Sequence, residues 1–282
     1  MKAVIPAAGL GTRLLPATKE QPKEMLPLFV KTLNGGICIK PLLQIVFEQL
    51  YGSNFREFCF ITGRTKRSIE DHFTPDPSYL NYLRKNNKQI LAEEMGNFYH
   101  MLENSGIFWV NQPEPKGFGD SILHASAFIR DGEDFLVYAG DNYIISPKNE
   151  YIQKLINAHK ELESDVTFSV SEVQNPRQYG IIIGKPLGKG IFKVDKVIEK
   201  PEEPPSKLAI HAVYVFNSGI FEAIRSTKPD ANGEIQLTDA IQRLIESGRR
   251  VHALQLGSNE VRIDIGDPAT YWQALKLSYD NH

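Results

Sequence analysis

The start of the chain constrains its fold most, because a short apolar run opens directly into a glycine-rich loop. Residues 3–8 read AVIPAA, and Gly9-Leu10-Gly11-Thr12-Arg13 follow at once. A buried strand that ends in glycines leaves bare backbone N–H groups at the carboxyl edge of a sheet, where they form a concave anion site. Lys23 follows ten residues after Arg13. Two fixed cations beside such a site suit a triphosphate whose charge must be spread during a reaction, so the opening predicts a nucleotide site.

Glycine pairs also occur in tight turns that bind nothing and in dinucleotide-binding folds. The dinucleotide fingerprint G-x-G-x-x-G needs a third glycine, and Leu14 holds that position. The other phosphate loop, G-x-x-x-x-G-K-[ST], is absent from the sequence. The glycines alone leave a ligand-free turn as an equal alternative. Arg13 and Lys23 in the same stretch are what favours a phosphate site.

Apolar runs and amphipathic stretches alternate through the first two thirds of the chain. This alternation predicts an α/β fold: a Rossmann-like, mostly parallel twisted sheet with helices on both faces. Strands are expected at 2–7, 57–62, 107–111, 134–139 and 165–172, and helices at 41–53, 64–73, 119–130 and 150–163.

Two regions depart from this alternation. Residues 78–105 are polar with helical periodicity, and they predict a helical insertion, about 74–106, at the edge of the core.

No clean linker interrupts the chain, so residues 1–282 are expected to form a single domain with parts at about 1–175 and 176–282. The second part is expected to hold a small antiparallel β-ribbon over the mouth of the core, at 180–184, 190–199 and 208–216, then helices near 218–226 and 236–247, a strand at 250–256 and a helix from about 268.

Charge and composition exclude several classes of function. The net charge is −2, so neither nucleic acid nor an anionic membrane is an expected partner. No apolar run approaches the ~20 residues of a membrane span. A strand begins directly after Met1, leaving no room for a signal peptide, and we expect a cytoplasmic protein. The seven histidines and two cysteines have no metal-binding spacing.

Two aspartates are candidate metal ligands. Asp141 ends an apolar strand within Tyr138-Ala139-Gly140-Asp141-Asn142, at the edge where parallel sheets bind ligands. A carboxylate there can hold Mg²⁺, although an Asp at this place can also simply begin a turn. Asp264 ends a second short strand beside Gly266, whereas Asp267 before Pro268 reads as a helix N-cap.

Several stretches together resemble one family. The opening AAGLGTRLLPATKEQPKEMLP, the segment Ile61–Phe73 and the run Gly233–Asp239 are similar to those of bacterial-type UTP–glucose-1-phosphate uridylyltransferases, within the sugar nucleotidyltransferases. The resemblance extends from residue 3 to about residue 277. It implies a Mg²⁺-dependent enzyme that joins UTP and glucose 1-phosphate, releases pyrophosphate, and forms homodimers or homotetramers.

The resemblance also assigns roles to individual residues. Gln112 would read the base, because an amide presents a donor beside an acceptor. The neighbouring Phe118 and Asp120 depart from the family pattern, and Asp120 is left without a role. Thr238 and Asp239 are expected to cap a helix. The implied nucleotide-binding residues are Ala8, Gly9, Gly11, Thr12, Arg13, Lys23, Gln112 and Gly117; the sugar-phosphate residues are Gly180, Glu199, Lys200 and Glu234; the metal ligands are Asp141 and Asp264; and the catalytic residues are Arg13, Lys23, Asp141 and Lys200.

Two departures leave alternatives open. Residues 30–39 read as an insertion that could alter a loop over the phosphates, and residues 211–217 replace the family's G-R-Y pattern. The second departure leaves the sugar undecided. A dTDP-sugar or broad-specificity NDP-sugar pyrophosphorylase therefore remains an alternative, as does a non-catalytic regulator that binds nucleotide sugars on the same fold.

Overall fold

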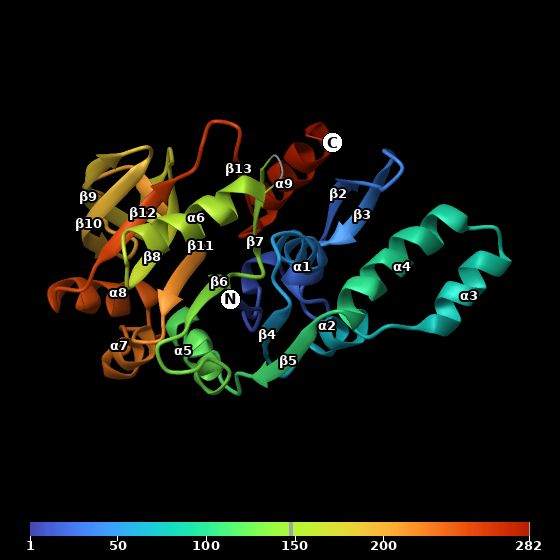
Figure 1. Cartoon of the computed structure of the whole chain (residues 1–282), viewed down its shortest axis with the longest axis horizontal. Coiled ribbons are helices and arrows are strands. Elements are labelled where there is room, and N and C mark those ends of the chain that lie inside the picture. Colours follow the sequence, from blue (N-terminus) through green and yellow to red (C-terminus); the bar gives the residue numbers. More distant parts are fainter. Residues whose placement is uncertain (147–148, 282) are drawn as a thin grey trace.

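A nine-stranded sheet runs through the computed structural model, which describes residues 1–146 and 149–281. The strand order is β5-β4-β1-β6-β11-β8-β12-β10-β9 (Figure 1). The strands of this sheet are β1 (Lys2–Pro6), β4 (Glu57–Thr62), β5 (Gly106–Asn111), β6 (Asp134–Tyr138), β8 (Val166–Glu172), β9 (Ile181–Gly188), β10 (Ile191–Ile198), β11 (Leu208–Asn217) and β12 (Val251–Gln255).

Helices cover both faces of the sheet, which confirms the expected α/β architecture. They are α1 (Leu42–Gly52), α2 (Arg67–His72), α3 (Pro77–Lys85), α4 (Gln89–Glu103), α5 (Phe118–Leu123), α6 (Glu150–Glu161), α7 (Ile220–Ser226), α8 (Leu237–Glu246) and α9 (Pro268–Asp280), with short 3-10 helices at Thr12–Leu14, Lys23–Met25, His124–Ala127 and Pro176–Gln178. Residues of α1, α4 and α6 belong to one hydrophobic core, and residues of α7 and α8 to a second. Within the described ranges, no helix is long and apolar enough to cross a membrane.

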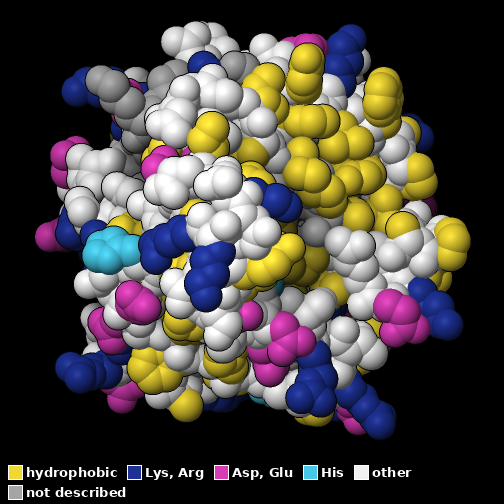
Figure 2. All heavy atoms as spheres, turned by 90° about the vertical axis from the view of Figure 1, so that its right-hand side faces the viewer, with side chains coloured by type: hydrophobic (Ala, Val, Ile, Leu, Met, Phe, Trp, Pro, Cys, Tyr) yellow, Lys and Arg dark blue, Asp and Glu magenta, His cyan; other side chains and the backbone are white. Residues whose placement is uncertain are grey.

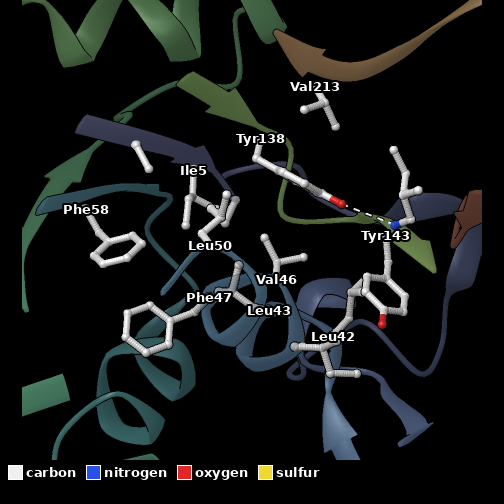
Figure 3. Packing of buried hydrophobic residues seen from close by; sticks show 14 of the residues in the cluster. Ile5, Leu42, Leu43, Val46, Phe47, Leu50, Phe58, Tyr138, Tyr143 and Val213 are labelled. Carbon is white, nitrogen blue, oxygen red and sulfur yellow. Dashed lines mark hydrogen bonds between the residues drawn. The ribbon is translucent and has the colours of Figure 1, made fainter. Parts of the chain in front are cut away.

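Strands β5, β4, β1 and β6 are parallel to one another, as the alternation predicted. They are buried on both faces: in β1, Ile5 belongs to one core and Val4 to the other. A strand covered on both sides must be apolar throughout, which explains the uninterrupted run at 3–8. On one face, α1 packs against these strands, with the Phe47 and Phe58 rings 4.8 Å apart between centroids (Figure 3).

The segment at 208–216, expected in the small ribbon, is instead the central strand β11. It pairs antiparallel with β6 and with β8, and so joins the parallel strands to the rest of the sheet. Most of its residues are buried, as a strand with neighbours on both edges and helices on both faces requires. Only β9 and β10 form the expected antiparallel ribbon, at one edge of the sheet. The helix expected at 119–130 is also shorter, because α5 ends at Leu123 and a 3-10 helix follows.

Two small antiparallel sheets were not foreseen from the sequence. One pairs β7 (Asn142–Ile145) with β13 (Val261–Asp264), and its register sets Asp264 opposite Asn142. This pairing places Asp264 beside Asn142, the residue that follows Asp141. The other joins β2 (Pro27–Lys31) to β3 (Ile37–Pro41).

The β2–β3 hairpin contains residues 30–39, which the sequence marked as an insertion. The hairpin packs on α4: the Leu33 N–H donates to Glu94 Oε1 at 2.5 Å, and Lys40 Nζ lies 3.3 Å from Glu94 Oε2. Helices α3 and α4 lie at the end of the molecule opposite to β9 and β10 (Figure 1). The hairpin therefore extends this helical end of the molecule.

Candidate active site

One cavity of about 570 Å³ lies at the carboxyl ends of β1 and β6, the edge at which α/β sheets bind ligands. The β2–β3 hairpin, which contains residues 30–39, is not among the described residues that line it, so the insertion takes no direct part in the cavity. The cavity brings together every residue that the sequence singled out for nucleotide, metal or sugar phosphate: Ala8, Gly9, Gly11, Thr12, Arg13, Lys23, Gln112, Gly117, Asp141, Gly180, Glu199, Lys200, Glu234 and Asp264.

The loop after β1 presents backbone donors to this cavity. Within residues 1–146 and 149–281, the N–H groups of residues 8–11 have no hydrogen-bond acceptor. Gly11 has φ +65°, a left-handed conformation that glycine adopts without a steric cost, and a 3-10 helix carries Arg13 from there. Thr18 Oγ1 donates to the Gly11 carbonyl at 2.8 Å and holds the turn. The loop thus has the free donors that an anion site needs.

Lys23 and Asp141 form an ion pair at the foot of this loop. Lys23 Nζ donates to Asp141 Oδ2. Burial alone would lower the pKa of Lys23, but the attraction of Asp141 and Glu24, together with the hydrogen bond to Asp141, outweighs burial and the pKa is raised. Burial would likewise raise the pKa of Asp141, and Lys23 reverses that effect and lowers it. Both side chains are therefore charged at neutral pH, with the ammonium held beside the phosphate-binding loop.

Asp264 shares the cavity with Asp141. Burial raises the pKa of Asp264, and repulsion from Asp141 adds to the rise while Arg262 opposes it. In the part of the chain that the structure describes, no group of three or more His, Cys, Asp or Glu side chains could enclose a metal. A pair of carboxylates nevertheless fits Mg²⁺, which commonly binds through one or two carboxylates and completes its octahedron with phosphates and waters.

Gln112 follows β5 directly and is only 5% exposed. Its Nε2 donates to Asp120 Oδ2 at 2.7 Å and to the Gly117 carbonyl at 3.3 Å. The sequence expected both the donor and the acceptor of this amide to face a base, but here the N–H groups are engaged within the protein. Gly117 has φ +98°, and an added Cβ would lie 2.9 Å from the Ile235 backbone, so only glycine fits.

Glu199 and Lys200 lie at the other end of the cavity. Thr238 Oγ1 donates to Glu199 Oε2 at 3.0 Å, and Lys200 Nζ lies 3.1 Å from Glu199 Oε1. Thr238 therefore holds Glu199 and does not cap α8, whose N-cap residue is Gln236. Lys200 has φ +38° and precedes Pro201, an unfavourable backbone that costs on the order of 1–3 kcal/mol and is typical of ligand sites.

Three polar residues of the cavity were not assigned from the sequence. Arg262 lies 3.2 Å from Asp264 Oδ2, donates to Asn142 Oδ1 at 3.3 Å, and stacks 4.7 Å from the Tyr179 ring centroid. Ser121 Oγ and Asn142 Nδ2 are buried, have no hydrogen-bond partner among residues 1–146 and 149–281, and line the same cavity. Nothing local marks Arg262 or Ser121 in the sequence, whereas the G-D-N triplet could have drawn attention to Asn142.

Free backbone donors, cations and paired carboxylates around one cavity of an α/β sheet define a nucleotide-binding transferase. The Nucleotidyl transferase family matches residues 2–280, and the chain belongs to that family. This membership and the similarities that follow confirm the resemblance and the fold class inferred from the sequence.

A UTP–glucose-1-phosphate uridylyltransferase of Staphylococcus saprophyticus is 40% identical over 272 residues, which are 94% of this chain and 87% of that protein. One of Bacillus subtilis is 38% identical over 269 residues, or 94% of this chain and 85% of that protein. The solved structure of a UDP-glucose pyrophosphorylase complexed with UDP-glucose superposes with a TM-score of 0.83 and 31% identity, covering 100% of this chain and 99% of that one.

Proposed function

We propose that this protein forms UDP-glucose and pyrophosphate from UTP and glucose 1-phosphate. The observation that carries the proposal is that one cavity holds the Gln112 amide, the glycine loop with its two cations, the carboxylate pair and the Glu199–Lys200 pair. These groups match a base, a triphosphate, a metal ion and a sugar phosphate in that order. The uridylyltransferases to which the chain is similar carry this activity in their names.

In the proposed reaction, a phosphate oxygen of glucose 1-phosphate attacks the α-phosphorus of UTP in line. A new P–O bond joins the two phosphates, the bond from the α-phosphorus to its bridging oxygen breaks, and pyrophosphate leaves with the electron pair. No protein nucleophile is needed, so catalysis is positioning and charge stabilisation. Arg13 and Lys23 would hold the triphosphate, Lys200 the attacking phosphate, and Glu199 and Gly180 the sugar.

A matrix of nucleoside triphosphates against sugar 1-phosphates tests the proposal, with pyrophosphate release as the rate and mass spectrometry of the product. We expect UTP with glucose 1-phosphate to give the highest kcat/KM, and pyrimidines to exceed ATP and GTP. A preference for dTTP or for another sugar would favour the alternative pyrophosphorylases. Absence of pyrophosphate with every pair would leave only a binding protein.

Magnesium is expected to be obligatory, with Asp141 and Asp264 as its protein ligands. Bound there, the ion would neutralise phosphate charge. Asp141→Asn keeps the side-chain shape but removes the charge that attracts a hard cation. We expect the Mg²⁺ concentration for half-maximal activity to rise at least 10- to 100-fold, the loss typical of even an outer-shell partner. Asp131→Asn, at an exposed position, is the control. An unchanged Mg²⁺ titration in Asp141→Asn would remove Asp141 from the metal site.

A homo-oligomer, dimeric or tetrameric, is expected in the cytoplasm. The end of the molecule that carries α4 and the β2–β3 hairpin shows a broad group of hydrophobic side chains (Figure 2). Leu33, Ile39 and Ile90 on these elements are more than half exposed. Light scattering measures the oligomeric state. A monomer at micromolar concentration would contradict this expectation without affecting the proposed reaction.

A further inference from the structure

The amide of Gln112 has a fixed orientation, and Asp120 is one reason for it. Asp120 Oδ2 and the Gly117 carbonyl both contact Gln112 Nε2, at 2.7 and 3.3 Å. A carboxylate and a carbonyl only accept hydrogen bonds, so the –NH₂ group must face them. The amide oxygen is thereby turned the other way. In the described ranges, no protein donor pairs with Gln112 Oε1, so this oxygen is available to a ligand.

Asp120 contacts a residue that lines the cavity but does not line the cavity itself. Gln112 lines the cavity, whereas Asp120, in the first turn of α5 and mostly buried, does not. The same carboxylate oxygen, Oδ2, also lies 3.5 Å from His124 Nε2. Asp120 therefore reaches a ligand by hydrogen bonding only through Gln112.

We propose that Asp120 is a positioning residue that locks the Gln112 oxygen toward the nucleotide base. The site would then select a base with an N–H at position 3, which uracil and thymine carry, over cytosine, whose N3 is an acceptor. Against cytosine, two acceptors would face each other and the amide could not turn over to relieve them. This inference rests on the proposed function and adds the residue that decides between pyrimidines.

The expected effect on nucleotide affinity is the loss of one hydrogen bond at a buried site. Leaving one buried acceptor unpaired lowers affinity by roughly 10- to 100-fold. The lock should therefore favour UTP over CTP by at least that factor. It should not separate UTP from dTTP, because both bases carry the N3–H.

The test compares UTP with CTP in the wild-type protein, in Asp120→Asn and in Asp120→Ala. Asparagine has the shape of aspartate but can donate as well as accept, so the amide of Gln112 is free to turn over and present its –NH₂ to the base. We expect the UTP:CTP ratio of kcat/KM to fall about tenfold or more in both variants, through KM, with kcat for UTP little changed. Calorimetric binding of UDP and CDP reports the same preference without turnover.

Glu114→Gln is the matched control. Glu114 lies in the same loop, is exposed and pairs with Lys116 at 2.7 Å; in the described structure it makes no hydrogen bond with Gln112. The Glu114→Gln substitution removes one negative charge near the site and should leave the UTP:CTP ratio of kcat/KM unchanged. An unchanged ratio in folded Asp120→Asn and Asp120→Ala would overturn the lock, as would an equal fall in Glu114→Gln. If the wild-type protein used no pyrimidine triphosphate but bound UDP tenfold more tightly than CDP, the proposed function would fail and the lock would stand.

Discussion

Lys23→Ala should lower kcat for UDP-glucose formation by about 10²–10³, the loss typical of removing one preorganised charge-stabilising donor. In the structure, the Lys23 ammonium is held by Asp141, and its Cε lies 3.5 Å from where a Cβ would be at Gly9. It is therefore positioned against the loop whose N–H groups face the cavity before any phosphate arrives. Arg13→Ala, in the adjacent 3-10 helix, should act in the same direction.

Pyrophosphate release at saturating substrates measures this effect, and thermal unfolding checks that the variant is folded. Lys19→Ala is the control, since Lys19 lies in the same segment, is exposed and pairs only with its neighbour Glu20 at 3.6 Å in the described structure. Turnover at the wild-type rate in a folded Lys23→Ala protein would show that Lys23 serves the fold rather than the reaction.

Lys66→Met should destabilise the fold by about 3–5 kcal/mol, the cost of leaving one member of a buried ion pair unpaired. Lys66 Nζ lies 2.7 Å from Glu24 Oε2, and the two side chains are 4% and 2% exposed. The pair connects Lys66, in the loop before α2, to Glu24, which follows Lys23. Burial raises the pKa of Glu24 despite the attraction of Lys66 and Lys23.

The raised pKa of Glu24 gives the sign of the pH dependence expected for the loss of stability in Lys66→Met. Without Lys66, a neutral Glu24 costs less to bury than a charged one, so the destabilisation should shrink as the pH falls and Glu24 takes up a proton. Urea unfolding at several pH values measures this. The double variant Glu24→Gln/Lys66→Met should recover part of the loss, and Lys154→Met, in an exposed pair with Glu150, should cost at most about 1 kcal/mol. A loss for Lys66→Met no larger than for Lys154→Met would contradict the argument.

The sequence was most informative where the physical cause of a structure is local. The apolar run before Gly9 predicts a two-sided buried strand, and β1 is one. Asp267 before Pro268 predicts a helix start, and Asp267 accepts from the Thr270 N–H at 2.9 Å as the N-cap of α9. Each of these patterns depends on neighbours within a few residues, so it can be recognised without knowing how the chain folds back on itself.

The sequence by itself determined the α/β class, the glycine loop and the residue types that could meet phosphate, metal and sugar. The tertiary structure decided which of them are neighbours. Strand pairing, which no single segment encodes, made 208–217 a central strand and set Asp264 opposite Asn142. Packing likewise placed Thr238 in hydrogen-bonding contact with Glu199, and Asp120 in hydrogen-bonding contact with Gln112. Local patterns specify which faces are apolar and which residues can hydrogen-bond, but partners far apart in the chain are selected only when the whole core closes.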